Sequence, residues 1–154
     1  MGIFRRLLGG SSAGKGPIKP QRLDYLNEAL ALERQGDFEA AIVSYRLALR
    51  DHPTDPRILQ NLAIALSRTG KVEDAIRHYR KALEMDASLP GAHYGLGFLL
   101  LRRGETDAAV KHIRAFLGNP PLGPEGQRWV AHAEAALRDL EMAPPQAAAG
   151  MEGA

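Results

Sequence analysis

Residues 56–89 read PRILQNLAIALSRTGKVEDAIRHYRKALEMDASL, and this stretch decides the fold. Its first half spaces apolar residues three and four positions apart, at Leu59, Leu62, Ala63 and Leu66. A glycine then interrupts the run, and the same spacing resumes at Ala75, Ile76, Tyr79, Ala82 and Leu83. This spacing places apolar side chains on one face of an α-helix, and an internal glycine indicates a helix end. The stretch therefore predicts two helices joined by a turn at Gly70.

The same pattern recurs with a period of 34 residues, and units that begin at Arg22, Pro56 and Pro90 align without a gap. The shared columns are Ala29, Ala63 and Gly97; Leu32, Leu66 and Leu100; Gly36, Gly70 and Gly104; Ala41, Ala75 and Ala109; Ile42, Ile76 and Val110; and Leu49, Leu83 and Leu117. Stacked helical hairpins bury their apolar faces against their neighbours. The sequence therefore predicts an all-α fold, an α-solenoid of three antiparallel helix-hairpin repeats.

Local signals agree with these helices. Asp55 precedes Pro56, so a capping side chain stands before a proline at the first helical position, where a missing N–H costs nothing. Small residues in the Ala29 and Ala41 columns would let the two helices of each hairpin approach closely.

On these residues the sequence resembles the tetratricopeptide repeat family, whose signature has the same period. The second unit carries the match through Leu59, Leu62, Ala63, Leu66, Ala75 and Tyr79. Pro53 and Pro121 supply the closing proline of the first and third units, whereas Ala87 departs from it in the second. The resemblance covers residues 22 to about 122. It implies a right-handed superhelix whose first helices line a concave side that holds a peptide or helix of another protein.

Both ends of the array differ from its interior, as the ends of a solenoid must. Glu28 stands in the first unit where later units have Leu62 and Leu96. A C-terminal capping helix is predicted from an apolar stripe at Trp129, Val130, Ala133, Leu137 and Leu140. We therefore divide the chain into a flexible basic tail (1–21), three repeats (22–55, 56–89 and 90–123), the capping helix (124–141) and a disordered tail (142–154).

The first helices keep apolar residues on the side turned away from the predicted core. Contiguous exposed apolar surface usually marks an interaction site. The candidate partner-binding residues on this concave face are Leu23, Leu26, Asn27, Leu30, Arg34, Arg57, Gln60, Asn61, Ile64, Arg68, Tyr94, Phe98, Leu101 and Arg102. The alternative is that the capping helix or a second copy of the chain covers this surface.

Two polar columns on this face each have two interpretations. Asn27 and Asn61 share a column in which, in similar arrays, an asparagine hydrogen-bonds the backbone of an extended ligand. Asparagine also tolerates a solvated helix position. Arg34, Arg68 and Arg102, with Arg57 beside them, would favour an acidic partner. The first three also stand in the last turns of their predicted helices, where a cation offsets the helix dipole without any ligand.

The carboxylate clamp by which some relatives grip chaperone C-termini is largely missing. Asn61 matches its column, but Leu26, Leu30, Gly91 and Gly95 stand where the clamp's other polar residues would be. The sequence therefore predicts a partner other than a chaperone tail.

Composition and charge argue against other classes of function. The chain has no cysteine, which excludes disulfides and zinc–thiolate sites. Residues 1–22 hold five basic and no acidic residues, so the rest carries 18 acidic residues against 15 of the 20 basic ones, a poor balance for nucleic-acid binding. The five histidines (His52, His78, His93, His112 and His132) show no metal-ligand spacing and are predicted to be solvated. We expect no cofactor, no metal and no enzymatic activity.

The N-terminal segment leaves several hypotheses open. Residues 9–16 (GGSSAGKG) approach a phosphate-binding loop, but Gly16 replaces the residue that would hold magnesium, so a linker is expected. Ile3, Phe4, Leu7 and Leu8 would share one side of a short helix. Residues 1–10 could make a weak membrane contact, target an organelle, remain a disordered tail, or fold back into the groove until a partner displaces them. No apolar run is long enough to span a membrane, so a cytoplasmic location is expected.

These observations predict a protein–protein interaction module, an adaptor or scaffold that binds a peptide or helix of a partner protein in its concave groove. Two alternatives stay open: a structural protein that self-assembles into homo-oligomers through the same surface, and a membrane-associated assembly factor tethered by its N-terminal segment.

Overall fold

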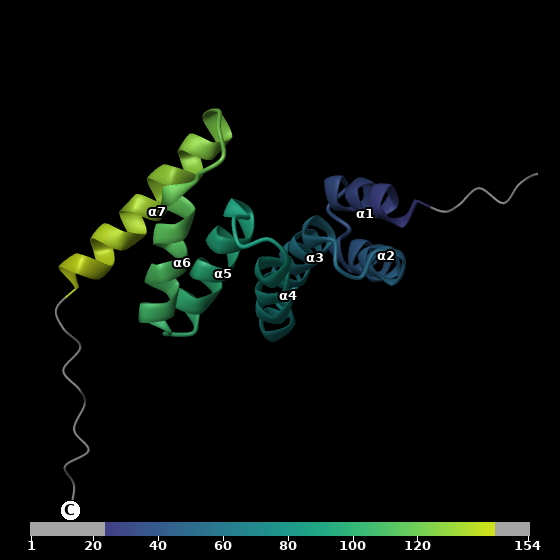
Figure 1. The fold of residues 1–154 in the computed structure, drawn as a ribbon, viewed down its shortest axis with the longest axis horizontal. Coiled ribbons are helices and arrows are strands. Elements are labelled where there is room, and N and C mark those ends of the chain that lie inside the picture. Colours follow the sequence, from purple (N-terminus) through teal and green to yellow (C-terminus); the bar gives the residue numbers. More distant parts are fainter. Residues whose placement is uncertain (1–23, 144–154) are drawn as a thin grey trace, which may run out of the picture.

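The computed structural model describes residues 24–143. These residues form seven helices and no strand. The helices are α1 (Tyr25–Arg34), α2 (Phe38–Asp51), α3 (Pro56–Arg68), α4 (Val72–Met85), α5 (Pro90–Arg102), α6 (Thr106–Gly118) and α7 (Pro124–Met142). The helices succeed one another across the molecule from α1 to α7 (Figure 1). The hypotheses about Leu23, the N-terminal segment and the C-terminal tail lie outside the described residues.

Each hairpin turns at a glycine with positive φ, as the glycine column predicted. The φ angles are 80° at Gly36, 77° at Gly70 and 78° at Gly104. The next residue's amide then donates to a carbonyl five positions back, as in the 2.9 Å bond from Lys71 to Leu66. A left-handed residue after a helix satisfies free carbonyls in this way, and glycine adopts it without steric cost.

Aspartates begin three of the helices. The carboxylates of Asp24, Asp37 and Asp55 accept bonds of 3.1, 3.1 and 2.9 Å from amides in the first turns of α1, α2 and α3. Pro56 and Pro90 stand at the starts of α3 and α5. The cap predicted at Asp55 is confirmed.

The small-residue columns lie in the core. Ala29, Ala41, Ala63, Ala75 and Ala109 are all 0% exposed. In the third hairpin even a methyl group would crowd the contact, because a Cβ built on Gly97 lies 2.9 Å from Cγ1 of Ile113. The two helices of each hairpin therefore approach as closely as the sequence predicted.

The hairpins stack in chain order, with α2 against α3, α4 against α5, and α7 closing the array against α6. Ile113, Phe116 and Ala133 form a second buried cluster, against which the cap residues Trp129, Val130 and Leu137 pack. This arrangement confirms the predicted all-α solenoid with a C-terminal capping helix. Among the described helices, none is both long and apolar enough to cross a membrane.

Candidate functional site

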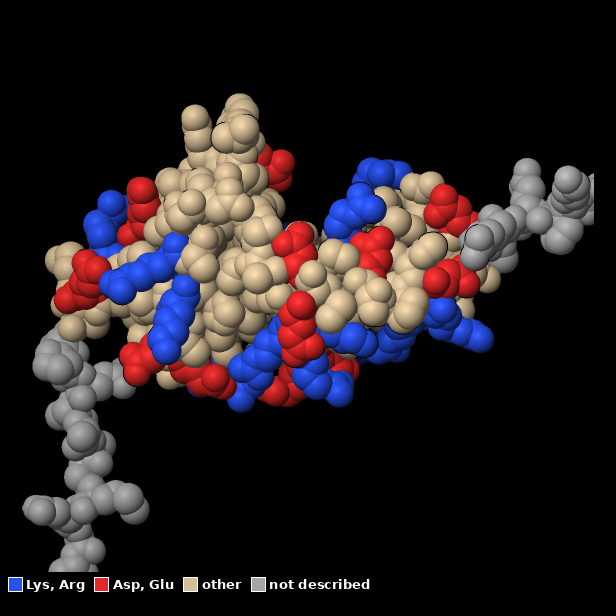
Figure 2. Space-filling model, in the orientation of Figure 1, with Lys and Arg blue, Asp and Glu red and all other residues tan. Residues whose placement is uncertain are grey.

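A pocket of about 490 Å³ lies where α3, α5 and α7 face one another. Its lining residues are Gln60, Ile64, Ser67, Arg68, Tyr79, Leu89, Pro90, Gly91, Tyr94, Gly95, Phe98, Leu99, Arg102, Pro121 and Trp129. In the space-filling view a hollow at the upper edge separates the α5–α7 end from the α1 end. The upper surface on the α5–α7 side shows few charged residues, whereas its outer edge carries both signs (Figure 2). We call this pocket the α3–α5 pocket.

Two glycines let neighbouring side chains form its floor. A Cβ on Gly95 would collide with the ring and hydroxyl of Tyr79, and a Cβ on Gly91 would lie 3.0 Å from the amide atoms of Gln60. Because neither side chain is present, Tyr79 reaches the pocket from α4, although it is only 3% exposed. Its burial raises the pKa of Tyr79 above its ordinary value, so the hydroxyl stays protonated and can donate.

An aromatic wall closes the side toward the capping helix. Tyr94 stacks on Trp129 with ring centroids 5.4 Å apart, and Phe98 stacks on His132 at 4.3 Å. The Tyr94 hydroxyl lies 2.6 Å from Nδ1 of His132, and burial raises the pKa of Tyr94. The capping helix therefore covers part of the predicted concave face and at the same time builds one wall of the pocket.

Arginines stand at the rim. Arg68 and Arg102 occupy the last turns of α3 and α5 and are both exposed. The Arg68 guanidinium lies over the Phe38 ring, 5.9 Å from its centroid. At these positions both arginines can offset the helix dipole, as the dipole interpretation of the arginine column requires. Both guanidinium groups can also face a ligand in the pocket.

A shallower hollow of about 420 Å³ adjoins the α3–α5 pocket toward α1. It is lined by Leu30, Glu33, Arg34, Phe38, Asn61 and Arg68. Its one carboxylate is engaged, because Oε2 of Glu33 accepts a 2.5 Å bond from the Tyr45 hydroxyl. Burial first, and this carboxylate second, raise the pKa of Tyr45. Arg68 lines both hollows, so they adjoin along α3, and we call the two together the groove.

The structure brings most of the predicted site residues to this groove. Leu30, Arg34, Gln60, Asn61, Ile64, Arg68, Tyr94, Phe98 and Arg102 line one or both hollows. Four others do not. Leu101 packs against the core, and Asn27 is held by Asp24 through a 2.5 Å side-chain bond. Leu26 and Arg57 line a different pocket.

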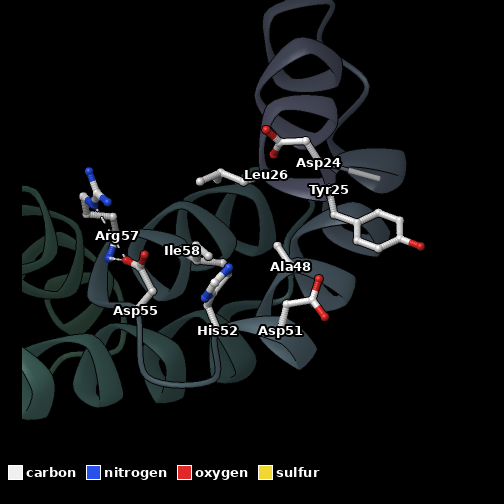
Figure 3. Close-up of a pocket in the computed structure, with 9 residues that line it drawn as sticks. All are labelled: Asp24, Tyr25, Leu26, Ala48, Asp51, His52, Asp55, Arg57 and Ile58. Carbon is white, nitrogen blue, oxygen red and sulfur yellow. Dashed lines mark hydrogen bonds and ion pairs between the residues drawn. The ribbon is translucent and has the colours of Figure 1, made fainter. Parts of the chain in front are cut away.

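That separate pocket, of about 550 Å³, lies between α1, the end of α2 and the start of α3 (Figure 3). Nε of Arg57 lies 3.7 Å from Oδ1 of Asp55. Two of the three aspartates in this pocket, Asp24 and Asp55, are helix caps. Within residues 24–143 no group of three or more His, Cys, Asp or Glu side chains is placed to hold a metal ion.

Sequence reasoning missed the residues that give the α3–α5 pocket its depth. Tyr79 comes from a second helix, and Trp129 and Pro121 come from the cap and the segment before it. The available signal was the pair of glycines at 91 and 95, which lets the side chains of Gln60 and Tyr79 pack against the backbone of α5.

The histidines were expected to be solvated. His52 and His132 are exposed, whereas His78, His93 and His112 are half-buried and make polar contacts. Nδ1 of His93 lies 3.0 Å from Nδ1 of His112, and Nε2 of His93 lies 2.8 Å from the Ala87 carbonyl. Nδ1 of His78 lies 2.7 Å from the Asp74 carbonyl. The linear pattern could not reveal these contacts, because the closest pair joins two helices of one hairpin.

Stacked helical hairpins with a groove along their first helices define a helical-repeat protein. The family comparison makes this specific: the tetratricopeptide repeat model matches residues 26–92, 61–124 and 94–153. The chain belongs to the tetratricopeptide repeat family. A comparison with curated proteins gives no significant match.

Solved structures give the same fold. The Yersinia enterocolitica type III secretion chaperone SycD, in complex with a peptide of the translocator YopD, is 19% identical with a TM-score of 0.70, over 76% of this chain and 89% of that one. PcrH in complex with the chaperone-binding region of PopD is 18% identical with a TM-score of 0.68, over 76% and 88%. The first repeat domain of RPAP3, bound to the HSP90 peptide SRMEEVD, is 21% identical with a TM-score of 0.63, over 74% and 93%.

Proposed function

We propose that this protein is an adaptor that binds a segment of a partner protein in the groove formed by α1, α3 and α5. The observation that carries the proposal is that the two hollows adjoin at Arg68 and are lined by residues of α1, α3 and α5. The groove combines half-buried apolar side chains, such as Ile64, with a polar residue at Asn61 and arginines at its rim. Apolar area supplies affinity, and a few placed polar groups fix the orientation of a ligand.

The structural relatives support this proposal through their fold. Three of them carry a peptide or binding region of another protein. At sequence identities of 18–21%, these relatives indicate the architecture of this chain only. Its partner is therefore inferred from its own groove. A chaperone tail remains an unfavoured partner, since Gly91 and Gly95 leave a gap where the clamp would place polar side chains.

Site-specific photo-crosslinking tests the proposal in cells that make the chain. We expect a photoreactive residue at position 61 or 64 to crosslink to one and the same partner segment, identified by mass spectrometry. The same residue at position 46, exposed on α2 and outside both hollows, is the control. Equal crosslinking from all three positions, or a partner captured from position 46 alone, would contradict the groove assignment.

A further inference from the structure

The floor of the α3–α5 pocket carries a buried polar atom without a partner. Oε1 of Gln60 is inaccessible to solvent and accepts no hydrogen bond from any described residue. A buried acceptor left unpaired loses its hydrogen bonds to water without replacement, so native proteins keep few of them. Gln60 lines the pocket beside Gly91, where an added Cβ would lie 3.0 Å from its amide atoms.

The pocket is also large enough for more than a loose surface contact. Its volume of about 490 Å³ falls within the range of about 300–1,000 Å³ that is typical of ligand pockets. Ile64, Leu99, Tyr94 and Trp129 line it with apolar surface. A bulky side chain inserted there would remove apolar area from water, which favours binding.

The charge of the lining has one sign. Among the described residues that line the α3–α5 pocket, the charged ones are Arg68 and Arg102. Both are exposed, and a guanidinium binds a carboxylate through paired hydrogen bonds. The pocket therefore favours a ligand that brings negative charge beside its apolar group.

We propose that the α3–α5 pocket receives one bulky apolar side chain of an extended acidic segment, with a carboxylate near that anchor facing Arg68 or Arg102. On binding, the Gln60 side chain turns its unpaired Oε1 toward the segment and accepts a hydrogen bond from it. This inference rests on the proposed function and names the chemical class of the partner.

Charge distinguishes this occupant from the chain's own N-terminal segment. Residues 1–22 bring five basic residues and no acidic one. Placing them beside Arg68 and Arg102 would bring like charges together, which is unfavourable.

Selection of random 12-residue peptides displayed on phage, against the immobilised full-length chain, tests the inference. We expect enrichment of one Leu, Met, Phe or Trp with Asp or Glu close to it. In a synthetic peptide of the enriched sequence, replacing the anchor by Ala should weaken binding at least about tenfold, as expected for a lost buried side chain. Replacing its acidic residues by Lys should have a similar effect, and both measurements leave the protein unchanged.

Protein variants then locate the anchor. Gly91→Ala pushes the flexible end of Gln60 into the pocket and should weaken binding several-fold, and Arg102→Glu should weaken it further. Gly118→Ala is the matched control, because a Cβ there meets nothing within 4 Å. Helix content by circular dichroism verifies that each variant is folded.

The outcomes separate the two proposals. Enriched peptides that are basic or lack an apolar residue overturn the inference. Binding that ignores Gly91→Ala and Arg102→Glu but is lost in Asn61→Ala also overturns it, while the proposed function survives. If the peptides bind equally well to all of these variants, the groove is not the binding site and the proposed function is wrong as well. If peptides bind only after Ile3→Ser, Phe4→Ser, Leu7→Ser and Leu8→Ser together, the chain's own segment is the occupant and the inference is wrong.

Discussion

Position 95 lies in the same column as Asn61, one repeat later. In the hollow toward α1, the Asn61 side chain fills that place, and Tyr45 donates to Glu33. One repeat later, Gly95 takes the place of Asn61, Tyr79 that of Tyr45, and Ser67 that of Glu33. The missing side chain at residue 95 lets the ring and hydroxyl of Tyr79 pack against the backbone of α5, so a change in a single column gives this pocket a different floor.

Gln60 gives a prediction in which stability and binding change in opposite directions. Gln60→Leu removes the unpaired buried acceptor with little change in volume, so it should raise the free energy of unfolding by about 1 kcal/mol. It should also weaken binding of the selected peptide, because the hydrogen-bond acceptor is gone. Urea unfolding and fluorescence polarisation measure the two effects. The control Gln127→Leu, at an exposed site on α7, should change neither.

A lower unfolding midpoint in Gln60→Leu together with unchanged peptide binding would show that Gln60 is a structural residue. Either result alone would already weaken its assignment as a ligand contact.

The residues that the sequence predicted best are those whose roles are local. The cap at Asp55 and the turn at Gly70 depend on a few neighbouring residues, and both were predicted correctly. Gln60 was predicted as a surface contact, whereas its buried acceptor depends on the distance between α3 and α5. The spacing of residues along the chain does not determine the distance between these two helices.

At the scale of elements, α7 is fixed by a glycine that faces the segment before it. A Cβ on Gly126 would collide with the carbonyl of Pro121, which is backbone and cannot rotate away. Pro121 and Trp129 both line the α3–α5 pocket, so the seating of α7 also shapes the groove.

Gly126→Ala should therefore shift α7 and cost about 1–3 kcal/mol of unfolding free energy, as overpacking commonly does. Trp129 is the single tryptophan of the chain, and its fluorescence should report a wetter environment. Gly118→Ala, which adds the same methyl group in open space, should leave both the emission and the stability nearly unchanged. Identical emission spectra in the two variants would contradict this account of α7.

The α5–α6 hairpin should lose stability in mild acid. The Ala87 carbonyl can only accept, so Nε2 of His93 carries a proton, and its Nδ1 accepts from Nδ1–H of His112 while His93 is neutral. Burial, then His93, then Arg80 hold the pKa of His112 below its ordinary value. The unfolded chain therefore binds a proton more readily than the folded one, and stability falls as the pH drops below about 6.5.

Urea midpoints at pH 7.5 and 5.5 measure this effect. His112→Gln keeps a donor beside His93 but cannot titrate, so its midpoint should fall less between the two pH values than that of the wild type. An equal fall in both proteins would place the pH sensitivity elsewhere. Asp74 and Asp86, whose pKa values are also lowered, titrate below this range.

At the scale of the whole molecule, the fold was predictable because one sequence pattern repeats along the chain. Three copies of one pattern gave the helices, their turns and the columns of small residues that lie in the core. The deep pocket is formed where the copies differ, at Gly91 and Gly95, and where the non-repeated α7 supplies Trp129. A pattern shared by all units could not reveal a site that occurs at one step of the array.

The most direct measurement of the central claim is a titration of the ¹⁵N-labelled full-length chain with the selected acidic peptide, followed by NMR. We predict saturable shifts of the backbone amides of Gly91 and Gly95, of the Gln60 side-chain amide and of the Trp129 indole. The amides of α2 should move little. Shifts concentrated on α2, or none at peptide concentrations that saturate binding in polarisation, would contradict a groove along α1, α3 and α5.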